Sequence, residues 1–194
     1  MRSPSPLAGL LAGGRERSPR PRGTAPLSAE PWLRGPLAGV HPLLAPILYS
    51  FQQAREDLRR WTEGLTTDQL WARPMGLGST GFHIRHIGGS VERLMTYALG
   101  GELTASQFAR LEREHEPGQP LSDLLSDLER RLSAAEELVR NLDPARLAEP
   151  RVVGRKRLPT TLGGLLTHIT EHTQRHVGET IVTVKVVRAT QPER

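Results

Sequence analysis

The chain has 194 residues, no cysteine and a formal net charge of +5 at pH 7. This length allows one domain with a substantial core, and the lack of cysteine excludes disulfides, thiolate metal sites and a cysteine nucleophile. No run of about 18 apolar residues is present, so we expect no membrane span. The absence of cysteine also suits a reducing compartment, and we expect a cytoplasmic protein.

The positive charge is concentrated at the N-terminus, where the first 40 residues contain six Arg and only two Glu. This segment is also rich in Pro, Gly and Ser. Such a composition buries too little apolar surface to offset the entropy lost on ordering. We therefore expect residues 1–36 to form a disordered tail and residues 37–190 to form the folded domain. The apolar stretch 7–12 is too short for a secretory signal.

The first long helix is predicted over residues 42–63. Its apolar residues recur with a period of 3.6 residues, and polar residues occupy the opposite face. These apolar positions are Leu43, Leu44, Ile47, Leu48, Phe51, Ala54, Leu58 and Trp61. A short helical turn is expected at residues 66–70, and the Pro and Gly residues of 74–78 should end it.

Two more helices are expected on either side of a long polar connection. The second helix should begin at Ser79 or Thr80, either of which can cap it, and should stop near Leu99 before two glycines. About twenty mostly polar residues follow. The third helix is predicted from about residue 121 to residue 138, with Ser122 as its N-cap.

The last helix is predicted to begin after Thr160 or Thr161 and to continue close to the C-terminus. Residues 144–157 before it are expected to be irregular, with the basic triplet 155–157 in a solvated turn. Residues 181–187 alternate as a strand would, but an isolated strand in an all-α chain would have no partner. Four long amphipathic helices predict an all-α four-helix bundle.

Five of the seven histidines lie on two of these helices. His168, His172 and His176 are spaced four residues apart, and His83 and His86 lie on the second helix. Residues i and i+4 share a helix face, so such a pair can bind one metal ion, and bundles build internal metal sites from facing helices. The competing interpretation is that these are core or boundary histidines without a metal.

The angular position of each histidine relative to the apolar stripe of its helix narrows the choice of possible metal ligands. At about 100° per residue, His176 lies about 60° from the centre of the stripe, His172 about 100° and His168 about 140°. His172 and His176 are therefore expected at the margin of the core, and His168 nearer to solvent. On the second helix the same test favours His83 over His86.

Three patterns in this sequence resemble the DinB/YfiT-like superfamily of metal-dependent four-helix bundles. Residues 82–90 (FHIRHIGGS) resemble its second-helix pattern, in which the ligand histidine directly precedes an aliphatic residue and small residues; that position is His86. Residues 168–179 resemble its fourth-helix pattern, whose H-x3-H ligands match His172 and His176. The long polar connection is the third feature. The chain departs from the common Gly-Gln ending, because Glu179 follows Gly178.

The resemblance implies a DinB-like bundle with a divalent metal ion (Zn, Ni or Fe) on His86, His172 and His176. It leaves His83 as a core residue or a neighbour of the ligands, and His168 at the surface or behind the site. Three neutral imidazoles leave a coordination position open, as in catalytic sites. The implied function is a metal-dependent thiol S-transferase or hydrolase acting on a small molecule, with a low-molecular-weight thiol as co-substrate; a homodimer is one expectation for its assembly.

Two other functions stay open. One is a non-enzymatic, stress-related bundle with a structural metal, although structural zinc normally has four protein ligands. The other is a nucleic-acid-binding protein acting through its Arg-rich tail, but no basic segment of the sequence is interleaved with aromatic residues.

Overall fold

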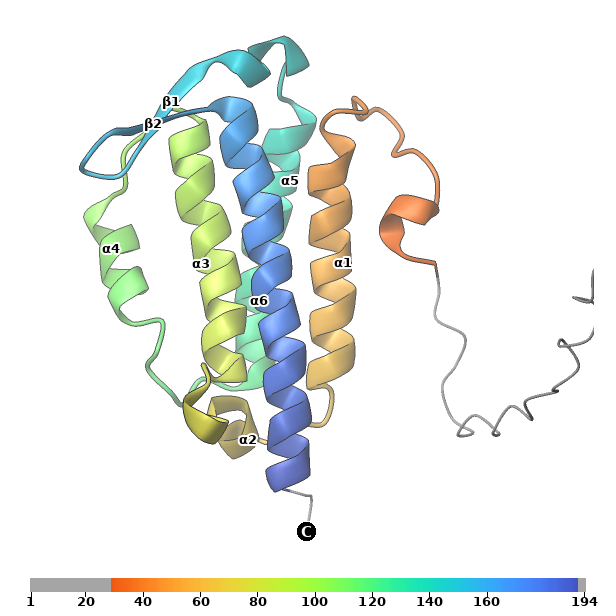
Figure 1. Ribbon diagram of the computed structural model, residues 1–194, viewed down its shortest axis with the longest axis vertical. Helices are drawn as coiled ribbons and strands as arrows, with labels where there is room; N and C mark the ends of the chain where they lie inside the picture. Colours follow the sequence, from red (N-terminus) through yellow and green to blue (C-terminus); the bar gives the residue numbers. More distant parts are fainter. Residues whose placement is uncertain (1–28, 192–194) are drawn as a thin grey trace, which may run out of the picture.

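The computed structural model describes residues 29–191, so most of the predicted tail lies outside the described residues. Four long helices run side by side: α1 (Ala45–Thr62), α3 (Thr80–Ala98), α5 (Leu121–Arg140) and α6 (Leu162–Thr190) (Figure 1). The predicted four-helix bundle is therefore confirmed. Within residues 29–191, no helix combines the length and the apolar character needed to cross a membrane.

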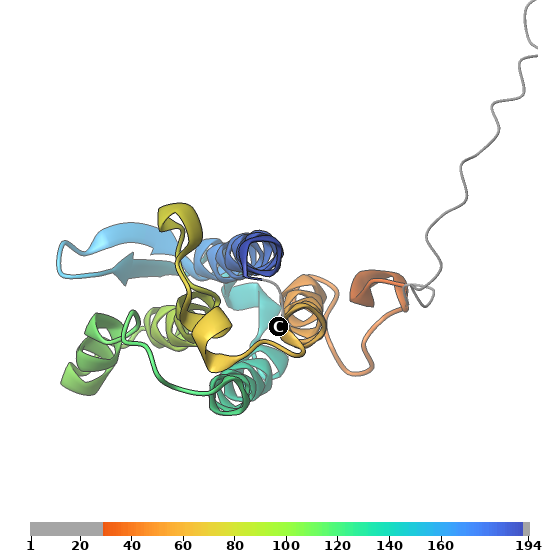
Figure 2. The same ribbon diagram turned by 90° about the horizontal axis from the view of Figure 1, so that it is seen from below.

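The four helices occupy the corners of the bundle when it is seen along its length (Figure 2). Helix α3 packs against α5 and α6, and α1 packs against the same two helices. The two helices that carry the histidines, α3 and α6, are therefore neighbours. Because α3 and α5 run in the same direction, the chain between them has to return along the bundle (Figure 1). This return accounts for the long connection.

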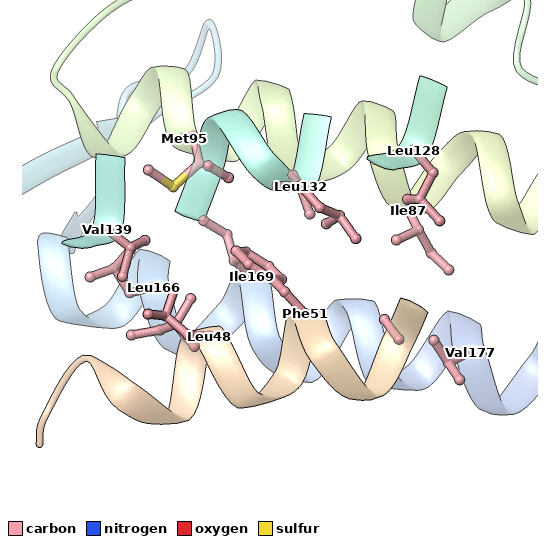
Figure 3. Close-up of a cluster of buried hydrophobic side chains, with 14 of the residues drawn as sticks. Leu48, Phe51, Ile87, Met95, Leu128, Leu132, Val139, Leu166, Ile169 and Val177 are labelled. Carbon is pink, nitrogen blue, oxygen red and sulfur yellow. The ribbon is translucent and has the colours of Figure 1, made fainter. Parts of the chain in front are cut away.

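The core consists of the apolar stripes of all four helices. Phe51 of α1, Leu132 of α5 and Ile169 of α6 are fully buried and meet between the helices (Figure 3). Burying a side chain of this size contributes about 1.5–3 kcal/mol, so the stripes predicted from the sequence account for the association of the helices.

The helix starts follow from the residues that cap them. The side chain of Ser79 accepts a hydrogen bond from Phe82 N at the start of α3, and Thr161 accepts one from Gly164 N at the start of α6. Helix α5, however, begins directly after Pro120, and the Ser122 hydroxyl donates to Asp123 Oδ1. The prediction that Ser122 is an N-cap was wrong, because the helix starts one residue before it.

The chain continues as helix through residues 181–187, as predicted, since α6 extends to Thr190. The short turn predicted at 66–70 is α2 (Thr67–Trp71), followed by η2 (Pro74–Gly76). Helix α1 begins at Ala45, three residues after the expected start, because residues 41–44 form a turn in which Leu44 N donates to His41 O.

Two segments contain elements that were not predicted. The long connection contains α4 (Ala105–Glu112), which Thr104 and Gln107 begin with a reciprocal capping box. The segment expected to be irregular contains η3 (Pro144–Ala148) and an antiparallel hairpin of β1 (Pro150–Val153) and β2 (Leu158–Thr161). The basic triplet lies exposed in the turn of this hairpin.

Ordered structure begins before the expected boundary at residue 37. Residues Pro31–Leu33 form the short helix η1, which packs against α1. The two Arg34 guanidinium nitrogens lie 2.5 and 2.7 Å from the Glu56 carboxylate oxygens, and the Tyr49 hydroxyl donates to Gly35 O at 2.8 Å. These contacts attach residues 31–35 to the bundle, whereas the prediction for residues 1–28 lies outside the described residues.

Candidate metal centre

Helices α3 and α6 bring three of the predicted histidines to one place. Ring centroids of His86 and His176 lie 4.5 Å apart, those of His172 and His176 4.6 Å, and those of His86 and His172 5.1 Å. One nitrogen from each ring can be chosen so that all three lie within 4.8 Å of one another. The predicted residues therefore form a group that can hold a metal ion.

The local structure explains this convergence. His172 and His176 are separated by one turn of α6 and project from the same face. Their face lies at the edge of the stripe that packs on α3, so the three rings are half-buried. A position at the core margin removes much of the surrounding water and still leaves access from outside.

The protonation of these rings favours metal binding. Burial and, to a lesser extent, the neighbouring imidazoles of His176 and His86 together lower the pKa of His172 to about 4. Burial also lowers the pKa of His176, with His86 as the next cause. Both rings are therefore neutral at pH 7, and neutral imidazole is the form that binds divalent ions.

A second group lies directly beside the first and shares His176 with it. His83, which is 5% exposed, places its Nδ1 3.2 Å from His176 Nδ1. Glu179 Oε2 lies 2.6 Å from His176 Nδ1 and 3.3 Å from His83 Nδ1. Because a carboxylate accepts hydrogen bonds, these distances assign the proton of His176 to Nδ1 and leave the lone pair that an ion needs on Nε2.

The remaining predicted residues take different positions. His83 is a buried core residue, as its phase on the helix indicated, and burial lowers its pKa to about 4. His168 is exposed, and its Nδ1 lies 2.6 Å from Glu171 Oε1. It belongs to neither group of potential ligands found within residues 29–191.

Sequence reasoning missed two polar side chains that contact His86: that of Ser90, whose Oγ lies 3.3 Å from His86 Nε2, and that of Glu114. Glu114 follows α4 in the long connection and is 3% exposed, and its Oε2 lies 2.6 Å from His86 Nδ1. A single glutamate in a polar segment gives no signal in the sequence. Only the return of the chain along α3 reveals the contact.

A cavity of about 550 Å³ opens next to the histidines. His83, His176 and Glu179 contribute polar groups to it, while Leu77, Phe82 and Val182 give it a largely apolar wall. A larger cavity of about 640 Å³, between the end of α3 and the hairpin, includes none of the histidines. The smaller cavity is therefore the relevant one for chemistry at this site.

The chain is thus a four-helix bundle with a potential metal site, formed by histidines that converge between two neighbouring helices. The chain belongs to the DinB superfamily, whose sequence profile matches residues 50–180, more than half of its length. No curated protein is similar enough to count as a match.

The fold is similar to that of a solved bacterial structure. The chain matches YfiT from Bacillus subtilis with a TM-score of 0.60 and 14% sequence identity, over 78% of this chain and 91% of the other. That protein is described as "a probable metal-dependent hydrolase with an unusual four-helix bundle topology". At this identity the likeness establishes the fold, and the parallel course of α3 and α5 is consistent with an unusual topology.

Proposed function

We propose that this protein is a metal-dependent enzyme of the thiol S-transferase or hydrolase type, with a divalent ion on His86, His172 and His176. The observation that carries the proposal is the convergence of three imidazoles from α3 and α6, with candidate ligand atoms within 4.8 Å of one another. Burial lowers the pKa of two of them, so they are neutral donors at pH 7.

The donor set fits Zn, Ni or Fe. Imidazole nitrogens suit these ions, and cysteine is absent from the chain. Three protein ligands leave at least one position for water or substrate, whereas structural zinc is normally closed by four. This difference favours a catalytic over a structural ion.

The surrounding residues have distinct parts in such an enzyme. His86, His172 and His176 hold the ion, and Glu179 keeps the proton of His176 on Nδ1. Leu77, Phe82 and Val182 can receive an apolar part of the substrate in the adjoining cavity. A divalent ion bound by the three histidines would act as a Lewis acid that makes water or a thiol nucleophilic near neutral pH.

Two lines support the type of reaction. The description of YfiT as a probable metal-dependent hydrolase favours hydrolysis by similarity of fold. The sequence resemblance to DinB/YfiT-like proteins favours a low-molecular-weight thiol as the nucleophile. In both cases the substrate is a small molecule that reaches the open position of the ion.

The open position can be tested by replacing the ion with Co(II) and titrating with a thiol, azide or imidazole. An accessible position should give a saturable change in the visible spectrum, and thiol binding should strengthen as the pH rises toward the pKa of the thiol. A spectrum that none of these ligands changes would mean that the protein closes the site. The structural-metal interpretation would then replace the enzymatic one.

A further inference from the structure

Glu114 is a carboxylate that is almost completely removed from water. It is 3% exposed, and each of its oxygens has a partner: Oε1 lies 2.7 Å from an Arg93 nitrogen and Oε2 lies 2.6 Å from His86 Nδ1. Arg93 is itself 8% exposed. Burying a charge is costly unless it is paired and hydrogen-bonded, so this arrangement needs a structural or functional reason.

The backbone around Glu114 is shaped to admit this carboxylate. A Cβ atom at Gly89 of α3 would lie 2.5 Å from Glu114 Oε1 and 2.7 Å from an Arg93 nitrogen, so a larger residue there would force these two side-chain ends to move. One Arg85 guanidinium nitrogen donates to three backbone carbonyls after α4, those of Arg113, Glu114 and Glu116. The connection is thus fastened to α3 at the level of His86.

The hydrogen bond between His86 Nδ1 and Glu114 determines which nitrogen of His86 can bind an ion. A carboxylate only accepts hydrogen bonds, so the proton of His86 lies on Nδ1 and its lone pair on Nε2. His176 has the same arrangement, because Glu179 lies against its Nδ1. Carboxylates placed behind ligand histidines fix ring orientation and make the imidazole a stronger donor.

We propose that Glu114, which is bound by Arg93 and fits beside Gly89, is a positioning residue of the metal centre that presents Nε2 of His86 to the ion. This inference rests on the proposed metal site and extends it to the long connection. The connection then supplies part of the centre as well as linking two helices. The competing explanation is that the Arg93–Glu114 pair only closes the connection onto the bundle.

The first test needs no substitution. Long-range ¹H–¹⁵N NMR of the zinc-loaded protein should show His86 protonated at Nδ1 and bound through Nε2. A proton on Nε2 of His86 would overturn the proposal, because the carboxylate would then not set the tautomer.

The second test compares Glu114→Gln with Glu116→Gln by titrating the metal-free proteins with Zn²⁺ against a competing chelator. Both variants lose one negative charge, but Glu116 is an exposed residue paired with Arg113. Losing a carboxylate behind a ligand histidine typically weakens metal binding about 10–100-fold, which is the loss we expect for Glu114→Gln. Glu116→Gln should bind zinc as the wild type does.

A second pair of variants, used in the third test, changes no charge. Gly89→Ala should displace the carboxylate and weaken zinc binding, whereas Gly178→Ala adds a Cβ with nothing within 4 Å and should leave the affinity unchanged. Unchanged zinc affinity in folded Glu114→Gln and Gly89→Ala would support the structural explanation instead. A wild-type protein that binds no zinc would contradict the metal centre itself. Failure of the proposed metal site can thus be told apart from failure of the role proposed for Glu114.

Discussion

The Nδ1 atoms of His83 and His176 lie 3.2 Å apart between α3 and α6. Glu179 is within 3.3 Å of both nitrogens, so the three side chains form a hydrogen-bonded group behind the proposed ligand His176. His83 also donates a stabilising hydrogen bond to the backbone of Gly78. In this arrangement His83 supports His176 and does not need to contact the ion.

Replacing His83 with Ala should therefore leave most of the metal bound and mainly reduce stability. The change removes a buried ring with its contacts to His176 and Gly78. Losses of this kind typically lie at about 1–3 kcal/mol. Elemental analysis gives the metal content, and denaturant unfolding gives the free energy of unfolding.

His86→Ala is the matched comparison, because it removes the other histidine of the same segment. We expect His86→Ala to lose the ion. The opposite pattern, in which His83→Ala loses it and His86→Ala keeps it, would place the ion on His83, His176 and Glu179 instead.

The metal-free protein should lose stability as the pH falls from about 6.5 toward 4. The pKa values of His83 and His172 are lowered to about 4, mainly by burial. Between these values and the ordinary pKa of 6.5, the unfolded chain binds more protons than the folded one. The stability is thus fully present above pH 6.5 and is lost as the pH falls through about 4.

Thermal unfolding of the chelator-treated protein across this pH range measures the effect. A His83→Ala, His172→Ala double variant should show a flatter pH dependence, since it lacks both groups. An equally steep decline in the double variant would assign the acid sensitivity to other residues.

The four long helices could be predicted because each buries a continuous apolar stripe. Helix α4 was missed because it is short and mostly exposed, with a capping box at Thr104 as its clearest local signal. The hairpin was missed because its strands have four residues each and the second contains Pro159. Their existence depends on pairing with each other, which periodicity in one segment does not reveal.

The candidate site was predictable to a similar degree. Spacing and family resemblance pointed to His86, His172 and His176, and the structure brings these three together, while their role as ligands stays a prediction. Phase on the helix correctly placed His83 in the core, but a metal ligand points toward its ion and not toward the centre of the stripe. Glu114 was not predictable, since its contact with His86 depends on the course of the connection.

Deleting residues 1–28 should leave the unfolding temperature unchanged, because their composition cannot build a core. Deleting residues 1–36 should lower the unfolding temperature, because this longer deletion also removes η1 and the Arg34–Glu56 pair. Any binding to DNA should weaken with salt and disappear in both truncated proteins. A large loss of stability on removing only residues 1–28 would show that they pack against the bundle.

The metal content of single histidine variants, purified without a nickel column, shows most directly whether His86, His172 and His176 bind an ion. We expect one divalent ion per chain in the wild type and in His168→Ala, because the side chain of His168 is exposed and bound to Glu171. The ion should be lost in His86→Ala, His172→Ala and His176→Ala. Full occupancy in His172→Ala, or a wild type that binds no divalent ion, would contradict the proposed metal site.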